Sequence, residues 1–331
     1  MSEINSSAGL NVFAGEHSLL DFLDPGKAPP TPMVELPPEL NPYRDRCIRV
    51  FLKLQYMTPI FNGKLLASRS LFEEAQAEGR LDGVHTLVEN SSGNKIFADI
   101  FLARLFGIKN VIASVPRDIP PDKQTVLELF GATCDKTAGG IERCRKLGRQ
   151  AGWWNPAQYH EDANVRGSER WLGPQILEQT CGEITLLCAG IGTGGTIKGA
   201  RDYLSVQVPM RTIGVVPATD EVPGTRTLRR LEEVGIEWRS ALDDGPVVVE
   251  ALEAYFHSLR LCSRGILAGP SSGMALAGLF KYLERLVGDF SGLWNDNGEV
   301  VAVVPCPDSC MLYLDKYSTR LLPEDMEAAI A

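Results

Sequence analysis

Residues 184–204 of the chain, ITLLCAGIGTGGTIKGARDYL, decide the fold. An apolar run leads into a glycine-rich turn at 190–195, and a helical pattern follows. The order predicts a strand, a phosphate-binding loop and a helix, because glycines let backbone N–H groups converge on an anion near a helix N-terminus. The hydroxyls of Thr193 and Thr196 add donors. From this stretch alone, a turn made glycine-rich for packing remains an alternative.

Two nucleotide-binding patterns can be compared with this loop. A Walker loop needs serine or threonine after its lysine, but Lys198 precedes Gly199. Gly190, Gly192 and Gly195 satisfy the dinucleotide spacing G-x-G-x-x-G, yet no carboxylate ends the next apolar segment at 210–217. The loop therefore favours a lone phosphate monoester.

A second strand-to-helix junction lies upstream, where ENSSGNK occupies residues 89–95 between an apolar run at 86–88 and a helical pattern at 96–105. Serine hydroxyls and N–H groups at a helix start suit a carboxylate, and an asparagine side chain can donate to a phenolate or carbonyl oxygen. Simple N-capping by Ser92 or Asn94 is the alternative interpretation.

A lysine in an apolar setting is the third candidate. Residues 52–56 alternate like a strand, turns follow, and Lys64 enters a helical run at 65–77. Partial desolvation beside leucines would lower the pKa of this amine and make it nucleophilic, whereas a solvated lysine is the alternative. Lys53 competes for the role, but its place in an alternating strand directs it elsewhere.

Seven marks in this order resemble the cysteine synthase and cystathionine β-synthase family of fold-type II pyridoxal-phosphate enzymes. The resemblance runs from about Pro30 to about Tyr317. The marks are TPMVEL at 31–36, LQYMTP at 54–59 with Lys64, SSGN at 91–94, QYH at 158–160 with Asn164, GTGGT at 192–196, GPSSG at 269–273 and PDS at 307–309. The resemblance implies an α/β fold of two domains, similar to tryptophan synthase β, with mostly parallel sheets flanked by helices.

The resemblance also implies pyridoxal 5′-phosphate as cofactor and assigns roles to matching residues. Lys64 would form the Schiff base, Asn94 would contact the ring hydroxyl and Ser271 the ring nitrogen. The phosphate would be held by Gly192, Thr193, Gly194, Gly195 and Thr196, and the substrate carboxylate by Ser91, Ser92, Gly93, Lys95 and Gln158. A neutral serine hydroxyl leaves the ring a weaker electron sink than an aspartate would, which suits β-elimination more than transamination.

The implied reaction is β-replacement on a serine- or cysteine-type amino acid: O-acetylserine, O-phosphoserine, serine or cysteine. The lysine amine would take the α-proton, the leaving group would depart to give an aminoacrylate, and a small nucleophile would add. One alternative is a lyase or deaminase that releases a keto acid and ammonia. A second is a non-catalytic binding subunit with the same fold.

Two departures from the family pattern bear on these roles. FNGKLL stands at 61–66 where the family usually has G-S-x-K-D-R, so the serine before the lysine and the charged pair after it are absent. Lys95 stands where threonine is usual. It would favour a substrate with extra negative charge through a charge-assisted hydrogen bond, and a solvated surface lysine is the alternative.

The composition is that of a soluble enzyme. The chain has 331 residues, 44% hydrophobic, and a net charge of −9, which argues against nucleic-acid binding through a general basic surface. Neither a membrane span nor a signal peptide is evident, so we expect a cytoplasmic protein that does not bind membranes. Eight cysteines without a C-x-x-C pair and four scattered histidines predict reduced thiols and no metal site.

The domain organisation follows from the alternation of patterns. Residues 1–40 form an arm and opening strand, 41–165 a domain with Lys64 and the carboxylate loop, and 166–331 a domain with the phosphate loop. Apolar runs near 86, 110, 184, 212 and 300 alternate with helical patterns at 122–131, 168–180, 247–260 and 273–287. The apolar patch at 19–23 would dock on a partner subunit or cover its own domain. A homodimer is expected.

Overall fold

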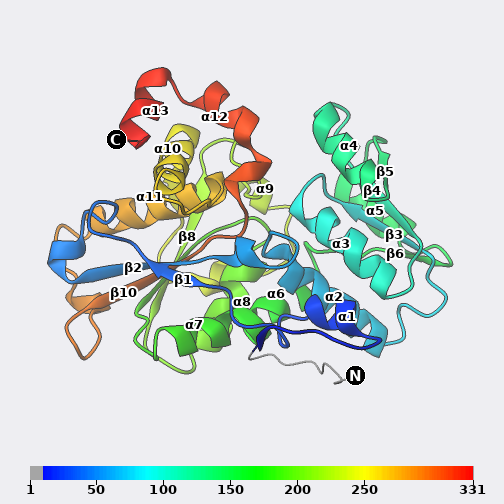
Figure 1. The fold of residues 1–331 in the computed structure, drawn as a ribbon, viewed down its shortest axis with the longest axis horizontal. Coiled ribbons are helices and arrows are strands. Elements are labelled where there is room, and N and C mark those ends of the chain that lie inside the picture. The colour runs from blue at the N-terminus through cyan, green and yellow to red at the C-terminus, as the bar shows by residue number, and fades with distance from the viewer. Residues whose placement is uncertain (1–9, 331) are drawn as a thin grey trace, which may run out of the picture. The chain divides into compact units, whose positions relative to one another are not determined.

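The computed structural model describes residues 10–330, which form two compact units (Figure 1). Unit 1 comprises the described part of Met1–Pro30 together with Lys64–Gly167, and unit 2 comprises Thr31–Gly63 and the described part of Ser168–Ala331. Both units are α/β with mostly parallel strands, which confirms the predicted fold class. Residues 41–63, which the sequence analysis groups with 64–165, fall in unit 2.

Unit 2 is built on a six-stranded sheet. In spatial order its strands are β1 (Met33–Glu35), β2 (Ile48–Lys53), β10 (Val300–Pro305), β7 (Leu186–Gly190), β8 (Arg211–Pro217) and β9 (Val247–Val249). Only β1 is antiparallel to its neighbour. Every residue of β10 is buried, as expected of a central parallel strand covered on both faces. The continuous apolar run near 300 is explained by this position.

Helices cover both faces of the sheet in unit 2 (Figure 1), with α10 and α11 on one face and α7 and α8 on the other. The helices are α7 (Gly173–Gln179), α8 (Gly195–Leu204), α9 (Leu228–Leu231), α10 (Ala251–Cys262), α11 (Pro270–Arg285), α12 (Leu314–Arg320) and α13 (Pro323–Ile330). Short 3-10 turns are η2 (Arg44–Arg46), η3 (Gln55–Met57), η5 (Arg239–Ala241), η6 (Ser291–Leu293) and η7 (Cys310–Leu312), and η4 (Ser168–Leu172) is a π-helical turn. The main core lies between α11, α10 and the sheet.

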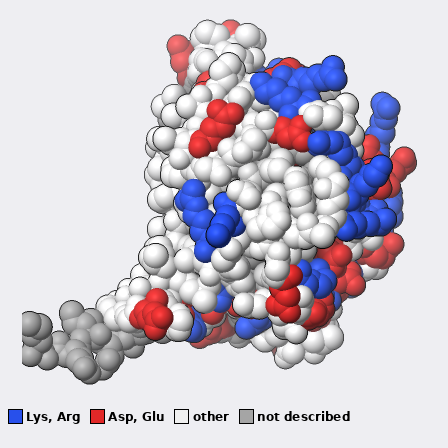
Figure 2. All heavy atoms as spheres, turned by 90° about the vertical axis from the view of Figure 1, so that its right-hand side faces the viewer, with Lys and Arg blue, Asp and Glu red and all other residues white. Residues whose placement is uncertain are grey.

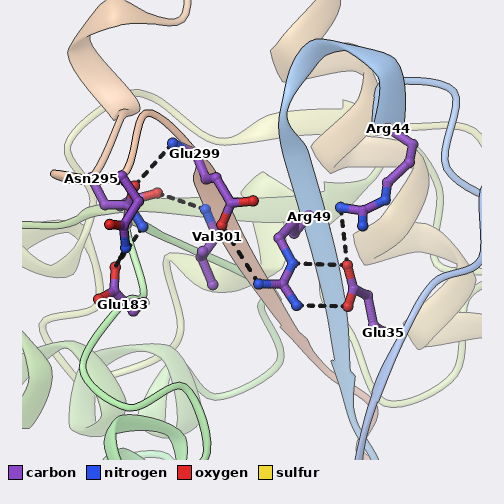
Figure 3. A network of polar contacts seen from close by, with 9 residues as sticks. Glu35, Arg44, Arg49, Glu183, Asn295, Glu299 and Val301 are labelled. Atoms are coloured by element: carbon purple, nitrogen blue, oxygen red, sulfur yellow. Dashed lines mark hydrogen bonds and ion pairs between the residues drawn. The ribbon is translucent and has the colours of Figure 1, made fainter.

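A polar network fixes the β1 edge of this sheet (Figure 3). The Arg49 guanidinium on β2 donates to both carboxylate oxygens of Glu35 on β1, at 2.9 and 2.8 Å. Arg44 approaches the same carboxylate at 3.2 Å, and Glu299 lies 3.5 Å from Arg49. The hydrogen bond from Arg49 lowers the pKa of Glu35. The network ties the antiparallel strand to its neighbour through a bidentate contact.

Unit 1 is built on a four-stranded parallel sheet. Its strands, in spatial order, are β5 (Ala132–Asp135), β4 (Asn110–Ser114), β3 (Thr86–Asn90) and β6 (Trp153–Trp154). Its helices are α1 (Ser18–Phe22), α2 (Lys64–Ala77), α3 (Asn94–Leu105), α4 (Pro121–Leu129), α5 (Gly140–Leu147) and α6 (Ala163–Gly167).

Figure 2 shows basic and acidic side chains interspersed on the face that it draws.

Two segments differ from the sequence-based expectations. The strand expected at 52–56 ends at Lys53, and Gln55–Met57 form a 3-10 turn because the Tyr56 N–H bonds to the carbonyl of Cys306 instead of extending a ladder. The helix expected at 247–260 begins only at Ala251. Val247–Val249 pair with β8, and a capping box between Glu250 and Glu253 starts the helix after them.

The N-terminal arm packs against unit 1. The Arg69 guanidinium of α2 donates to the carbonyl of Leu20 at 3.2 Å and lies 3.6 Å from the Asp24 carboxylate, and Leu23 is buried. Leu23 of the patch at 19–23 therefore packs within its own unit, whereas Leu19 and Phe22 are 65% and 41% exposed. Residues 1–9 lie outside the described part of the chain.

Residues 10–330 contain neither a membrane-spanning helix nor a cluster suited to a metal ion. Across residues 10–330, none of the helices combines the length and apolar character needed to cross a membrane. Within the same range, histidine, cysteine, aspartate and glutamate side chains do not form a cluster of three suited to a metal ion.

Candidate active site

The glycine-rich loop of unit 2 joins β7 to α8, and close packing demands its glycines. Gly194 has a left-handed φ of +87°, and a Cβ there would lie 2.5 Å from the Cβ of Trp238. A Cβ on Gly192 would lie 2.3 Å from the carbonyl oxygen of Gly224. Gly194 is also the N-cap of α8, so it brings no capping side chain. The amides of the first helical turn and the Thr193 hydroxyl thus lie where a phosphate would bind.

Ser271 lies next to this loop within unit 2. It is the second residue of α11, and a Cβ on Gly190, the last residue of β7, would lie 3.6 Å from the Ser271 carbonyl oxygen. The Cys188 thiol donates to the carbonyl of Ala275 at 3.4 Å. This hydrogen bond joins β7 to α11 about one helical turn after Ser271. The structure therefore brings the end of β7, where the phosphate loop begins, close to the start of α11, which carries Ser271.

The second junction, in unit 1, joins β3 to α3. Its N-cap is Gly93, rather than Ser92 or Asn94 as the alternative interpretation required. The Ser91 hydroxyl accepts hydrogen bonds from the N–H groups of Gly93 at 3.3 Å and Ile96 at 3.4 Å. These contacts are long, so Ser91 orders the loop only weakly.

Gln158 is held against the same strand end. Its N–H lies 3.4 Å from a carboxylate oxygen of Glu89, whose other oxygen accepts from the N–H of Asn90 at 2.8 Å. The carbonyl of Gln158 accepts from the Asn164 amide at 2.6 Å. Within unit 1, therefore, the serine loop and Gln158 meet at the carboxyl end of β3.

Lys95 is neither solvated nor an uncompensated cation. It is 2% exposed, and its ammonium lies 2.5 and 2.6 Å from the two carboxylate oxygens of Asp99, which is fully buried. Burial raises the pKa of Asp99 and of Glu89, and the charge of Lys95 opposes both shifts. The surface-lysine alternative is therefore wrong. Lys95 therefore does not supply an uncompensated positive charge to a substrate, because Asp99 matches that charge.

Lys64 opens α2 in unit 1, and its charge also acts on the carboxylate of Asp99. The turn that precedes it, in unit 2, is locked by hydrogen bonds between Thr58 and Asn62, at 2.8 Å from hydroxyl to carbonyl and 3.2 Å from N–H to hydroxyl. Asn62, which replaces the family's usual serine, donates from its side chain to the carbonyl of Ile60 at 3.0 Å. The altered sequence thus still gives a rigid approach to the lysine.

The competing lysine has a different environment. Lys53 is fully buried at the end of β2 in unit 2, and its amine donates to the carbonyl of Thr31 at 2.6 Å and to the Gln179 side chain at 2.7 Å. Burial lowers its pKa to about 7. Its two neutral oxygen partners connect β2 to the segment before β1 and to α7, which is a structural role.

Sequence reasoning missed three carboxylates close to these residues. Asp99 follows Lys95 by four residues, a spacing that places the two on one helix face and could have revealed the pair. Glu89 lies in the junction at 89–95 and Asp308 in the mark at 307–309, but a motif does not show that both carboxylates are buried. Asp308 accepts a hydrogen bond from the Ser271 hydroxyl at 3.2 Å.

Comparison with known proteins decides the family. Residues 26–305 match the family described as "Pyridoxal-phosphate dependent enzyme". The chain belongs to this family. The enzyme is thus pyridoxal-phosphate dependent, as the sequence marks implied.

Relatives and solved structures agree with the assignment. A cysteine synthase of Staphylococcus aureus is 29% identical over 262 residues, covering 74% of this chain and 83% of that protein. One from Helicobacter pylori is 27% identical over 252 residues, covering 72% and 82%. An O-acetylserine-dependent cystathionine β-synthase from H. pylori has a TM-score of 0.71 at 24% identity, covering 86% of this chain and 94% of that one. An O-ureido-L-serine synthase has a TM-score of 0.74 at 22% identity, covering 89% and 92%. The two structures share the fold.

The cofactor fits the residues present. The phosphate loop can keep its path only with glycine at 192 and 194, and it leads into a helix N-terminus that favours a phosphate. Ser271 lies beside it, buried but polar. Considered by itself, unit 1 has a lysine at the start of one helix and a hydroxyl-rich loop at the start of another.

Proposed function

We propose that this enzyme catalyses β-replacement on a serine- or cysteine-type amino acid, as the names of its cysteine synthase relatives suggest. The observation that carries the proposal is the similarity to those synthases over 74% of the chain. Lys64, the serine loop, the glycine loop and Ser271 all lie within the stretch at 26–305 that matches the family.

When bound, the cofactor would supply an aldehyde for amine exchange and a ring that withdraws electrons from the substrate. Lys64 would hold it covalently and, once released, would accept the substrate α-proton. The amides at 192–196 would bind the phosphate, Asn94 would donate to the ring hydroxyl, and Ser271 would contact the ring nitrogen.

The substrate carboxylate would bind at the start of α3. Ser91, Ser92 and Gly93 offer hydroxyls and backbone N–H groups, and Gln158 lies at the same strand end. Lys95 would act on this site indirectly, since its ammonium is engaged by Asp99. We therefore propose Lys95 as a support for the loop rather than as a direct ligand.

The donor would be O-acetylserine, O-phosphoserine, serine or cysteine. Because the charge of Lys95 is compensated, the site offers no additional free charge from this residue for a phosphorylated donor. On that ground we place O-acetylserine first. The accepting nucleophile would be a small molecule.

We further propose a homodimer in the cytoplasm. The eight cysteines form no disulfide among the described residues, which agrees with a reducing compartment. Sedimentation equilibrium of the purified protein would test the dimer, and microscopy of a tagged protein in its native host would test the compartment.

The test of the activity is an absorption spectrum of the protein loaded with pyridoxal phosphate, followed by addition of each donor with and without sulfide. Borohydride reduction and peptide mapping should place the cofactor on Lys64, and Lys64→Ala should abolish this attachment. A new β-substituted amino acid in the presence of sulfide would support replacement. Keto acid and ammonia as the main products, even with sulfide present, would favour the lyase. Failure to take up the cofactor would favour the binding subunit.

A further inference from the structure

Two thiols of unit 2 lie against each other. Cys262 is the last residue of α10, Cys310 is the first residue of η7, and a hydrogen bond joins the two side chains. Both pack in one apolar cluster with the rings of Tyr255 and Tyr317. Both are reduced in this structure, so the pair is a dithiol.

The backbone holds the two thiols together. The N–H of Cys310 donates to the carbonyl of Leu267 at 3.0 Å, and Ala268 forms a β-bridge with Ser309. The thiol of Cys262 donates to the carbonyl of Ala268 at 3.6 Å. The chain after α10 is therefore paired with the start of η7, which keeps one sulfur beside the other.

The two thiols differ in how readily they ionise. The hydrogen bond from Cys262 lowers the pKa of Cys310 more than burial raises it, and the Ser309 hydroxyl lowers it further. The same hydrogen bond raises the pKa of Cys262, and burial adds to this effect. Cys310 is therefore the thiol that ionises first, and the thiolate is the nucleophilic form of cysteine.

The pair lies close to the protein surface. Cys262 is half-buried, and Cys310 is 4% exposed. Two residues beside Cys310 are more open, since Met311 is 59% exposed and Leu267 is 41% exposed. A molecule as small as hydrogen peroxide thus has a short path to the buried thiol.

We propose that Cys310 and Cys262 form a reversible oxidation site, at which hydrogen peroxide links the two sulfurs in a disulfide. The Cys310 thiolate attacks one peroxide oxygen, so that the O–O bond breaks, an S–O bond forms and hydroxide leaves. Cys262 then loses its proton and attacks the oxidised sulfur, which breaks the S–O bond, forms the S–S bond and releases a second hydroxide. The two thiol protons convert both hydroxides to water. Two thiols are oxidised and one peroxide is reduced.

The disulfide would act on the candidate cofactor site within unit 2. Covalent bonding brings two sulfurs closer than a hydrogen bond does, so oxidation draws η7 and the end of α10 together. The residue two positions before η7 is Asp308, whose carbonyl accepts from the N–H of Gly269 at 2.9 Å. Gly269 is the N-cap of α11, which carries Ser271. Oxidation should therefore weaken cofactor binding, a consequence that rests on the proposed contact of Ser271 with the cofactor.

The test of the disulfide uses the full chain without added cofactor. The protein is treated with hydrogen peroxide, the remaining thiols are blocked with iodoacetamide, and linked peptides are mapped by mass spectrometry. We expect Cys262 and Cys310 to form the first intramolecular link, and dithiothreitol should restore both thiols. A first link between Cys310 and another cysteine, or no intramolecular link, would overturn the inference.

Two variants test the separate roles of the thiols. Cys262→Ala removes both the second thiol and the hydrogen bond, so Cys310 should react more slowly with peroxide and then accumulate as a sulfenic acid that dimedone traps. Cys47→Ser removes an exposed thiol of unit 2 and should leave the link unchanged. Equal behaviour of the two variants would contradict the inference. If Cys262→Ala did not fold, the peptide map of the wild type would still decide.

The effect on the cofactor is measured by titrating reduced and oxidised protein with pyridoxal phosphate. Affinity should fall several-fold on oxidation of the wild type and of Cys47→Ser, and less in Cys262→Ala. Equal affinity of the two wild-type forms would overturn the coupling to the cofactor site. Failure of the reduced wild type to bind the cofactor would instead overturn the proposed function, while the peptide map would still test the disulfide.

Discussion

Two helices that begin at candidate binding loops carry the same pair of charged residues in different surroundings. In α3 of unit 1, Lys95 and Asp99 are 2% and 0% exposed; in α8 of unit 2, Lys198 and Asp202 are 24% and 36% exposed. Both pairs are four residues apart and bonded through both carboxylate oxygens. Spacing alone therefore does not distinguish a structural ion pair from a surface one. Burial sets the energetic consequence.

The two candidate binding loops are also shaped by different means. The loop before α8 depends on glycines whose missing side chains allow close packing, whereas the loop before α3 has Gly93 in open space. The β3–α3 junction instead carries buried charged groups, Glu89, Lys95 and Asp99. We conclude that unit 2 shapes its loop by backbone geometry and unit 1 by buried charge.

The largest expected effect comes from breaking the buried pair. Lys95→Met leaves Asp99 buried without its cation and should lower the free energy of unfolding by about 3–5 kcal/mol. Urea unfolding followed by circular dichroism would measure it. The matched control is Lys95→Met with Asp99→Leu, which removes both charges and should recover most of the loss. A single variant as stable as the wild type would show that the pair is not a structural element.

A somewhat smaller effect should follow from a side chain in the backbone-shaped loop. Gly194→Ala forces alanine into a left-handed conformation, which costs about 1–2 kcal/mol, and the added Cβ must also displace Trp238. Urea unfolding and pyridoxal-phosphate affinity should both weaken. Gly93→Ala is the control, because nothing lies within 4 Å of its added Cβ. Equal losses of stability in the two variants would refute the contrast between the loops.

The buried charge of unit 1 should also appear as a dependence on pH. Burial raises the pKa of Glu89 above its ordinary 4.5. Protonated Glu89 therefore makes its full contribution to the stability of the folded chain below pH 4.5. This contribution is lost as pH rises through the raised pKa, because in that interval the unfolded chain binds fewer protons than the folded chain. Glu89→Gln should remove this part of the slope in unfolding free energy measured from pH 4 to 8. Glu237→Gln, at an exposed position of unit 2, should not.

The smallest effect is expected for the exposed pair. Lys198→Met should change the free energy of unfolding by only about 0.3–0.5 kcal/mol, the range of exposed pairs at this helical spacing. Added salt should reduce even that difference. A loss comparable to that of Lys95→Met would mean that burial is not what separates the two pairs.

Much of the fold could be predicted from the sequence because its central strands are continuous apolar runs. β3, β4, β7, β8 and β10 all lie where such runs occur. β9 was not predicted, since three valines directly before a helical pattern look like its first turn, and only pairing with β8 makes them a strand. Similarly, no local signal shows that β1 and β2 belong to the sheet of unit 2, far from its other strands in the sequence.

In the candidate site, the loops could be predicted from the sequence, but the buried charged contacts could not. Glycines and serines at strand ends have local chemical meaning, so the loops could be found in the sequence. The burial of Lys95 could not be predicted from the sequence, because it depends on the packing around α3. The sequence places Asp308 only within the PDS mark at 307–309. Its contact with Ser271 could not be predicted, because the two residues lie 37 positions apart in the chain.

The position of β10 has a consequence for how the chain folds during synthesis. β10 lies between β2 and β7, so the sheet of unit 2 cannot close until the ribosome has made Val300–Pro305. Unit 1, apart from its N-terminal arm, is continuous from Lys64 to Gly167 and can fold while the rest is still being translated. Until then β2 has only β1 as a partner, with its other edge exposed. A nascent chain of this enzyme should therefore depend on chaperone protection of that edge late in translation.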